Sequence, residues 1–348
     1  MIGLPIEWIA ALIIVLVVAL AVFTLYMVIE RHRENKRTLL AATYLNNNRI
    51  GWYDYLRTDG VPEDHLIPRN DAEVKAVEEL FRMLVHNVKE DGMEERISGF
   101  ANRWMSGFYR KKLNGRNWGE RMNALYRIYD FGIDSLTVDC RDMAKKSISE
   151  EEFFLLLLID MKFYPETFVR DNLLELCALS ANDAKELLFR MQEATFEETV
   201  CHFDELELTI QYALVDVIGM KLDATYVPFL ETQFNTKDSE LRIRVLRAYN
   251  SLGIVPVVTV YEAAVESDVW QERHQAAKML KWLPQQSAVR YAAHFEKDDM
   301  FLVREEAKLF STASSIEDQV SPLVAAAAED EGWLLDTQSP DGKGGDQI

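Results

Sequence analysis

The sequence predicts an all-α protein in which one N-terminal transmembrane helix precedes a solenoid of stacked antiparallel helix pairs. Three observations predict this fold: an uncharged apolar run near the N-terminus, helical periodicity that continues almost unbroken after residue 71, and a motif that recurs at a nearly constant spacing in the C-terminal half. Gly (15) and Pro (9) are scarce in the chain. This scarcity disfavours a turn-rich β-sandwich and favours long helices.

The apolar run predicts a membrane anchor. Residues 9–29 read IAALIIVLVVALAVFTLYMVI without a charge, and at 1.5 Å per residue this helix is about 30 Å long, the hydrocarbon thickness of a bilayer. Trp8 and Tyr26 suit the two membrane interfaces. A cleavable signal peptide has a basic start and a shorter apolar core, whereas MIGLPIEW contains no Lys or Arg. We therefore expect a transmembrane anchor over residues 1–30, with a buried core helix as the alternative.

The charges beside this run predict its orientation. Only Glu7 precedes it, and four basic residues follow it: Arg31, Arg33, Lys36 and Arg37. Because Lys and Arg are retained on the cytoplasmic side, the N-terminus is expected outside and residues 31–348 in the cytoplasm. The three scattered cysteines form no disulfide framework, which agrees with a reducing compartment.

The rest of the chain divides into four segments. Residues 31–70 are expected to be a juxtamembrane connector that prolongs the spanning helix and then breaks at Gly60, Pro62 and Pro68. Residues 71–164 form a helical region that consists either of degenerate repeats or of a separate cap. Residues 165–328 are expected to be helical repeats, and residues 329–348 an acidic tail that is partly disordered.

The repeats are clearest in three segments of the C-terminal half. These read DSELRIRVLRAYNSLG (238–253), DVWQERHQAAKMLKWL (268–283) and DMFLVREEAKLFST (299–312). Each has an acidic start, a bulky apolar residue, an Arg three positions later and then a small residue. The corresponding residues are Leu241/Arg244/Ala248, Trp270/Arg273/Ala276 and Phe301/Arg304/Ala307. A weaker copy, ELELTIQYALVDVIG, lacks the Arg, and NWGERMNALYRIYDFG places Arg121 at the offset of Arg273.

This pattern resembles the HEAT-repeat family, in particular its short bacterial variety, which is similar to the repeats of phycobilin lyases. The resemblance implies a solenoid, because one helix pair cannot bury its own apolar face and must stack on its neighbours. It also implies that loop Asp and helix Arg residues pair between repeats. The residues expected to form this structural ladder are Asp238, Arg244, Asp268, Arg273, Asp298 and Arg304.

One basic stretch departs from the acidic background. Residues 103–127 contain seven Lys or Arg and one Glu, with aromatic residues between them. Within it RKKLNGRNWG is expected to be a basic loop between two helices. Its cations, Arg110, Lys111, Lys112 and Arg116, are candidates for contact with anionic lipid or with an acidic protein partner. The alternative is a solvated loop without a partner.

No motif for chemistry is present. The sequence lacks GxxxxGK[ST], GxGxxG, GxSxG, HExxH and EF-hand patterns. The six histidines have no metal-like spacing, and the adjacent Cys201 and His202 point to different faces of a helix. Acidic clusters such as Glu150–Glu152 are expected to be solvated first turns of helices. We therefore predict no catalytic residue, no metal site, no bound cofactor and no small-molecule substrate, and the net charge of −19 disfavours nucleic acid.

These observations favour a membrane-anchored cytoplasmic scaffold or adaptor over an enzyme. The expected partner is a membrane-associated protein, for example an enzyme such as a glycosyltransferase of envelope polysaccharide, by analogy with bacterial proteins of this build. The first alternative is an enzyme without a recognisable motif, including one similar to phycobilin lyases. The second is a signal-transducing protein, although the anchor begins close to the N-terminus and leaves little chain before it.

Overall fold

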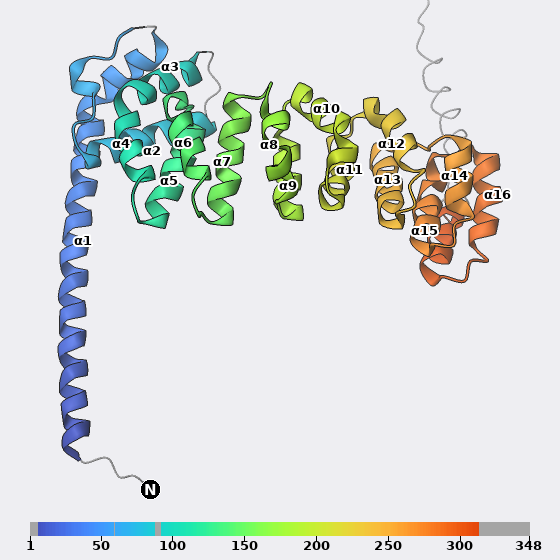
Figure 1. Cartoon of the computed structure of the whole chain (residues 1–348), viewed down its shortest axis with the longest axis horizontal. Coiled ribbons are helices and arrows are strands. Elements are labelled where there is room, and N and C mark those ends of the chain that lie inside the picture. Colours follow the sequence, from blue (N-terminus) through green and yellow to red (C-terminus); the bar gives the residue numbers. More distant parts are fainter. Residues whose placement is uncertain (1–5, 59, 88–91, 313–348) are drawn as a thin grey trace, which may run out of the picture. The chain divides into compact units, whose positions relative to one another are not determined.

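The computed structural model describes residues 6–58, 60–87 and 92–312, and every regular element in these ranges is helical (Figure 1). The all-α prediction is therefore confirmed for the part of the chain that the structure describes. The predicted tail at 329–348 lies outside the described residues. The chain divides into two compact units, Met1–Phe168 and Val169–Ile348, which are considered separately below.

Helix α1, Ile6–Arg57, is one unbroken helix of 52 residues. Its most apolar window has none of its residues buried, so the helix is long and apolar enough to cross a membrane. Figure 1 shows this part of α1 extending alone beyond the other helices of unit 1.

The opposite end of α1 belongs to the core of unit 1. Trp52 and Leu56 are 2% and 5% exposed, and the Trp52 ring lies edge-on to Phe81 and Phe100 with ring centroids 5.4 and 4.9 Å apart. The segment predicted as a connector is thus in part a core element. The helix break predicted at Gly60, Pro62 and Pro68 lies between Arg57 and the start of α2 at Asp71.

The remaining helices of unit 1 are short and pack around this aromatic core. They are the 3₁₀ turn Asp64–Leu66, α2 Asp71–Asn87, α3 Met93–Phe100, the π-helical turn Ala101–Met105, α4 Ser106–Leu113, α5 Trp118–Asp130, the 3₁₀ turn Asp134–Leu136, α6 Thr137–Ala144 and α7 Glu150–Phe163. Helix α2 contacts α1, α5 contacts α4 and α7, and α6 contacts α7. Side-chain caps explain two of the starts: Asn117 caps α5, and Ser149 forms a capping box with Glu152 on α7.

Unit 2 consists of helices that follow one another along the chain. They are α8 Phe168–Cys177, α9 Ala181–Arg190, α10 Glu193–Cys201, the 3₁₀ turn Phe203–Glu205, α11 Leu208–Lys221, the 3₁₀ turn Ala224–Tyr226, α12 Val227–Gln233, α13 Ser239–Leu252, α14 Val258–Val265, α15 Trp270–Lys278, the 3₁₀ turn Met279–Trp282 and α16 Gln285–Phe295. A last helix covers residues 301–312.

Within unit 2, helices α9, α11, α13 and α15 form a row in which each contacts the next (Figure 1). Small residues bring two of them together: a Cβ on Gly219 of α11 would lie 3.0 Å from the Cα of Ala248 on α13. The predicted small repeat residues Ala248, Ala276 and Ala307 are all at most 3% exposed. Small buried side chains thus allow the close approach of α11 and α13.

Candidate functional site

The basic segment lies at the end of α4. Arg110, Lys111 and Lys112 occupy the last turn of this helix, so the predicted loop is restricted to residues 114–117, which include Arg116. The helix continues this far because Leu113 is buried, and because cations at a helix C-terminus interact favourably with the helix dipole. The expectation of a loop over the whole segment is therefore wrong.

Two of the four cations form ion pairs within unit 1. Arg110 Nε lies 3.1 Å from Asp139 Oδ2, and Lys112 Nζ lies 2.7 Å from Glu120 Oε1. Lys111 and Arg116 are exposed, and no carboxylate among the described residues forms an ion pair with either side chain. The structure thus leaves two of the four positive charges available to an external anion.

A cleft of about 440 Å³ adjoins the basic segment. Its lining comes from four helices and includes Glu34 and Arg37 of α1, Lys75 of α2, Phe108 and Lys112 of α4 and Glu120 of α5. Lys75 Nζ lies 2.7 Å from Glu34 Oε1, and this hydrogen bond lowers the pKa of Glu34 and raises the pKa of Lys75. The cleft brings the segment of α1 that follows the apolar run to the same place as the end of α4.

Deeper in the cleft, the Tyr109 hydroxyl donates a hydrogen bond to Glu78 Oε1 at 2.7 Å. Burial raises the pKa of both groups, and the Glu78 carboxylate raises that of Tyr109 further. The aromatic residues of the basic stretch 103–127 differ in burial. Tyr109 is 1% exposed and belongs to the core, whereas Trp118 is 50% exposed.

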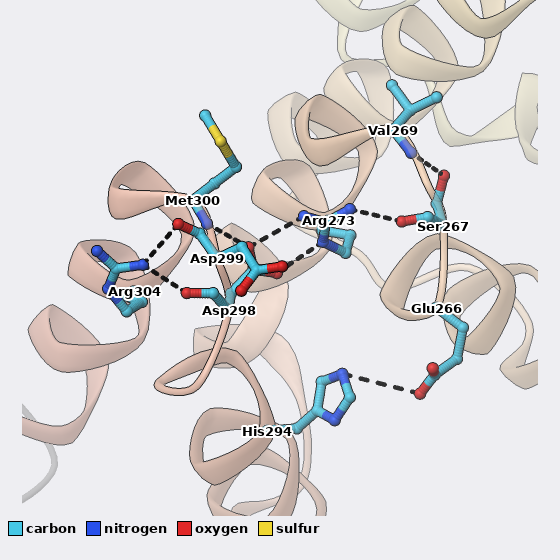
Figure 2. A network of polar contacts seen from close by, with 9 residues as sticks. All are labelled: Glu266, Ser267, Val269, Arg273, His294, Asp298, Asp299, Met300 and Arg304. Atoms are coloured by element: carbon cyan, nitrogen blue, oxygen red, sulfur yellow. Dashed lines mark hydrogen bonds and ion pairs between the residues drawn. The ribbon is translucent and has the colours of Figure 1, made fainter.

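The predicted ladder in unit 2 centres on Arg273. Its Nε and Nη2 donate to the two carboxylate oxygens of Asp298 at 2.6 and 3.0 Å, and its Nη1 donates to the Ser267 carbonyl at 2.7 Å (Figure 2). Arg273 of α15 is therefore bound to the loop before its own helix and to the loop that precedes the helix over residues 301–312. The pair is largely buried, with side-chain exposures of 17% for Arg273 and 6% for Asp298.

The other predicted pairings are different. Arg244 pairs with Asp216 and Glu240, whereas Asp238 caps α13 and accepts a hydrogen bond from the Tyr212 hydroxyl. Asp238 and Arg244 do not pair because Asp238 is turned toward the backbone N–H groups at the start of its own helix.

Asp268 and Arg304 also depart from the prediction. Arg273 hydrogen-bonds to Asp298 and not to Asp268. The negative charge of Asp268 contributes only to the raised pKa of Arg273. Arg304 donates to the main-chain carbonyls of Asp298 and Asp299 at 2.5 and 2.8 Å, not to a carboxylate (Figure 2).

The contacts reveal a different repeat register, which we call the equal-interval register. It consists of Arg242, Arg273 and Arg304, which follow one another at one constant interval of sequence. Each donates to the carbonyl of the residue six positions earlier, at 2.8, 2.7 and 2.5 Å. The acceptors also accept a hydrogen bond through their side chains from the backbone N–H two positions later; they are Thr236, Ser267 and Asp298.

The same position occurs further upstream. Gln211 precedes Arg242 by the same interval, and its side chain donates to the carbonyls of Phe203 and Leu206 at 3.0 Å. In unit 1, Arg121 donates to the carbonyl of Gly115, again six positions earlier, at 3.2 Å. Glutamine thus replaces the arginine that the weaker copy lacks and retains its contact with the preceding loop.

Two of these arginines, Arg121 and Arg242, also form ion pairs with buried carboxylates. Arg121 Nε lies 2.7 Å from Glu152 Oε1, and Arg242 Nη2 lies 2.8 Å from Glu272 Oε1; the two Glu side chains are 1% and 2% exposed. Sequence reasoning missed both. Glu152 was expected in a solvated first turn and is instead buried, because Arg121 and the Ser149 N–H satisfy its oxygens.

The ion pairs shift two acidic groups in the same direction. Burial alone would raise the pKa of Glu152, but hydrogen bonds from Arg121 and Ser149 outweigh it and leave the pKa lowered. The hydrogen bond from Arg273 lowers the pKa of Asp298 against the effect of burial. Both carboxylates therefore remain ionised at neutral pH and hold their arginines in place.

The cysteines and histidines lie apart from these sites. Burial raises the pKa of Cys140 to about 12, whereas Cys201 is exposed. His202 Nδ1 lies 2.8 Å from Glu205 Oε1 within the CHFDE segment, and His294 lies 3.8 Å from Glu266 (Figure 2). Among the described residues, no group of three or more His, Cys, Asp or Glu side chains is placed to hold a metal ion.

Comparison with known proteins adds no family: no family model matches the chain, and neither does any curated protein.

Proposed function

We propose that the chain is a membrane-anchored cytoplasmic scaffold whose helical body, a HEAT-like solenoid, binds a membrane-associated protein. The observation that carries this proposal is the continuity of α1. One helix combines an exposed apolar segment with an end at Trp52 and Leu56 that is buried in the core of unit 1. An anchor built in this way is part of the folded body.

This continuity has a mechanical consequence. The described part of α1 between the apolar segment and the core contains no helix break, so unit 1 follows the tilt and rotation of the membrane segment. A tether of this kind raises the local concentration of the body near any membrane partner without adding a contact. It thus suits an adaptor that keeps its partner close to the membrane.

The equal-interval register supports the HEAT-like part of the proposal. The side chains at Gln211, Arg242, Arg273 and Arg304 all bind the loop that precedes their helix, and two of the arginines also bind a carboxylate of the following repeat. Polar contacts of this kind, made in each repeat, would keep successive helix pairs in the same geometry. Helix pairs stacked in one geometry make a long surface suited to a protein partner.

Exposed apolar side chains mark a surface where that partner would bind. Phe189, Met220 and Trp282 are 49%, 56% and 45% exposed, and they lie near the C-terminal ends of α9, α11 and the turn after α15. Positions 189, 220, 251 and 282 are separated by the same interval as Arg242, Arg273 and Arg304. Phe189, Met220 and Trp282 occupy three of these positions, and Ser251 occupies the fourth. Aromatic residues and Met are enriched in protein interfaces, so we propose that these three side chains form the contact surface.

The experiment is a cross-linked co-purification of the full chain from detergent-solubilised membranes. A variant with Phe189→Ser, Met220→Ser and Trp282→Ser is compared with the wild type. The control carries Leu174→Ser, Val258→Ser and Val289→Ser, which remove other exposed apolar side chains of unit 2.

We expect one integral membrane protein to be retained by the wild type and the control and lost from the first variant. Equal recovery with all three chains would contradict the proposed surface. Substrate turnover by the purified chain alone would favour the enzyme alternative and contradict a scaffold.

A further inference from the structure

The structure fixes the height of the basic segment relative to the apolar part of α1. Glu34 and Arg37 follow the last residue of the apolar run, Ile29, by five and eight positions, which is about 8–12 Å along a helix. Both side chains line the same cleft as Phe108 and Lys112 of α4. The end of α4 therefore lies at this height.

This height is close to the lipid surface if α1 spans the bilayer. The headgroup region adds only about 5–8 Å to each side of the hydrocarbon core. The cations at the end of α4 then lie within about one Debye length, roughly 8 Å at physiological salt, of the headgroups. At this distance the charge of the membrane acts on them directly.

Arg37 of α1 and Lys112 of α4 line one cleft, so basic segments from two distant parts of the sequence lie close together here. We define the membrane-proximal rim as Arg31, Lys36 and Arg37 of α1 together with Lys111 and Arg116 at the end of α4. Among the described residues, no carboxylate forms an ion pair with any of these five side chains. The nearby acids have other partners: Glu30 pairs with Arg33, Glu34 with Lys75, Glu120 with Lys112 and Asp139 with Arg110.

We propose that the membrane-proximal rim binds the surface of an anionic phospholipid bilayer, a second attachment beside α1. The inference rests on the proposed membrane anchoring. Charge favours it, because five cations that form no ion pair with a described carboxylate belong to two neighbouring segments in a chain whose net charge is −19. An anionic leaflet attracts this rim and repels most of the remaining surface. Because unit 1 and α1 tilt and rotate together, the rim would fix the orientation of both relative to the bilayer.

The test uses the full chain in lipid nanodiscs, with a fluorophore on Asn114→Cys. Asn114 is exposed and lies between Lys111 and Arg116, and Cys177→Ser and Cys201→Ser remove the accessible native thiols. Quenching by a phosphocholine lipid spin-labelled in its headgroup reports contact between the rim and the surface. Nanodiscs of phosphatidylcholine alone are compared with nanodiscs that also contain phosphatidylglycerol.

The comparison variants are Lys111→Gln/Arg116→Gln and, as a matched control, Arg49→Gln/Arg57→Gln. The control removes two cations of α1 that follow Arg37 in the sequence and lie about 18 and 30 Å further from the membrane along the helix. Each basic residue near an anionic leaflet contributes about 1 kcal/mol, or roughly fivefold. The rim variant should therefore lower the ratio of docked to undocked rim about 25-fold, and the control should leave it unchanged.

We expect stronger quenching with phosphatidylglycerol, its loss in the rim variant and its weakening at high salt. Equal quenching in both lipid compositions, or in the rim variant and the wild type, would overturn the inference while α1 remains inserted. Insertion is measured separately by resistance to alkaline extraction. A chain that is extracted overturns the membrane anchoring itself, and the rim proposal fails with it.

Discussion

Replacing Arg273 by Met is the sharpest perturbation of the ladder. Methionine retains a long apolar stem but removes all three hydrogen bonds that the guanidinium makes to Asp298 and Ser267. The Asp298 carboxylate, 6% exposed, then keeps only the Met300 N–H as a hydrogen-bond donor. The variant thus leaves a buried charge without its counter-ion.

The size of the effect follows from this burial. Removing one partner of a buried ion pair costs about 3–5 kcal/mol, and an unsatisfied carbonyl such as that of Ser267 adds about 1 kcal/mol. The remaining hydrogen bond and the partial exposure of Arg273, 17%, reduce the total. We expect a net loss of about 3 kcal/mol, which corresponds to a factor on the order of 100 in the opening equilibrium.

Hydrogen exchange of the full chain in detergent measures this loss locally. The slowest amides of α15 and of residues 301–312 should exchange about 100-fold faster, whereas those of α5 in unit 1 should not change. Arg290→Met is the control, because Arg290 is 70% exposed and lies 4.0 Å from Glu262, so its loss should cost less than about 1 kcal/mol. If Arg273→Met exchanges within a fewfold of the wild type, the ladder does not stabilise these helices.

Three further predictions concern packing and charge. Arg242→Met should destabilise α13 and α15 by about 2–4 kcal/mol in the same assay, because it removes the ion-pair partner of Glu272, whose side chain is 2% exposed. Arg244→Met should cost about 1 kcal/mol, because its buried partner Asp216 keeps an ion pair with Lys185. Equal losses of stability in the Arg242 and Arg244 variants would contradict the equal-interval register. Gly219→Val should cost at least about 2 kcal/mol in urea denaturation, since its Cβ would lie 3.0 Å from the Cα of Ala248. The control is Gly107→Val, because a Cβ at Gly107 has no atom outside its own helical backbone within 4 Å. Glu152 and Asp298 have lowered pKa values, so they stabilise the fold at pH values above their ordinary pKa values of 4.5 and 3.8. This contribution is lost as the pH falls through their pKa values in the folded protein. The urea midpoint should therefore fall as pH decreases below about 5, and a flat profile down to about pH 3 would contradict the shifts.

The helical nature of the chain and its apolar N-terminal helix could be predicted from the sequence because both follow from local patterns. Apolar residues at helical spacing predict α2, and the long uncharged run at 9–29 predicts the exposed part of α1. The role of residues 41–57 could not be predicted in this way. Trp52 becomes a core residue only through its contacts with Phe81 and Phe100, which lie far away in the sequence.

The ladder was predicted only in part because its geometry depends on backbone acceptors. The segment DSELRIRVLR contains Arg242, Arg244 and Arg247, and alignment on an acidic start selects Arg244. The structure selects Arg242, since its guanidinium reaches the Thr236 carbonyl. Every residue has a main-chain carbonyl, so the sequence does not show which carbonyl an arginine binds. Only the constant interval between Arg242, Arg273 and Arg304 identifies the arginine that makes this contact.

The basic segment illustrates the same limit. Its residues and its net positive charge are evident in the sequence, but the pairing of Arg110 and Lys112 with Asp139 and Glu120 is not. Its proximity to Arg37 depends on the cleft between α1 and α4. Charge composition thus predicted a candidate surface, whereas the fold determines which cations remain available.

The most direct test of the membrane-anchored architecture is the sidedness of two thiols in cells that express the full chain. Gly3→Cys is placed before the apolar run, and the exposed Cys201 reports on the body once Cys177→Ser has removed the other accessible thiol. A membrane-impermeant maleimide should label position 3 in intact cells and Cys201 only after permeabilisation. Labelling of Cys201 in intact cells, or protection of position 3, would contradict a helix that crosses the membrane with the body in the cytoplasm.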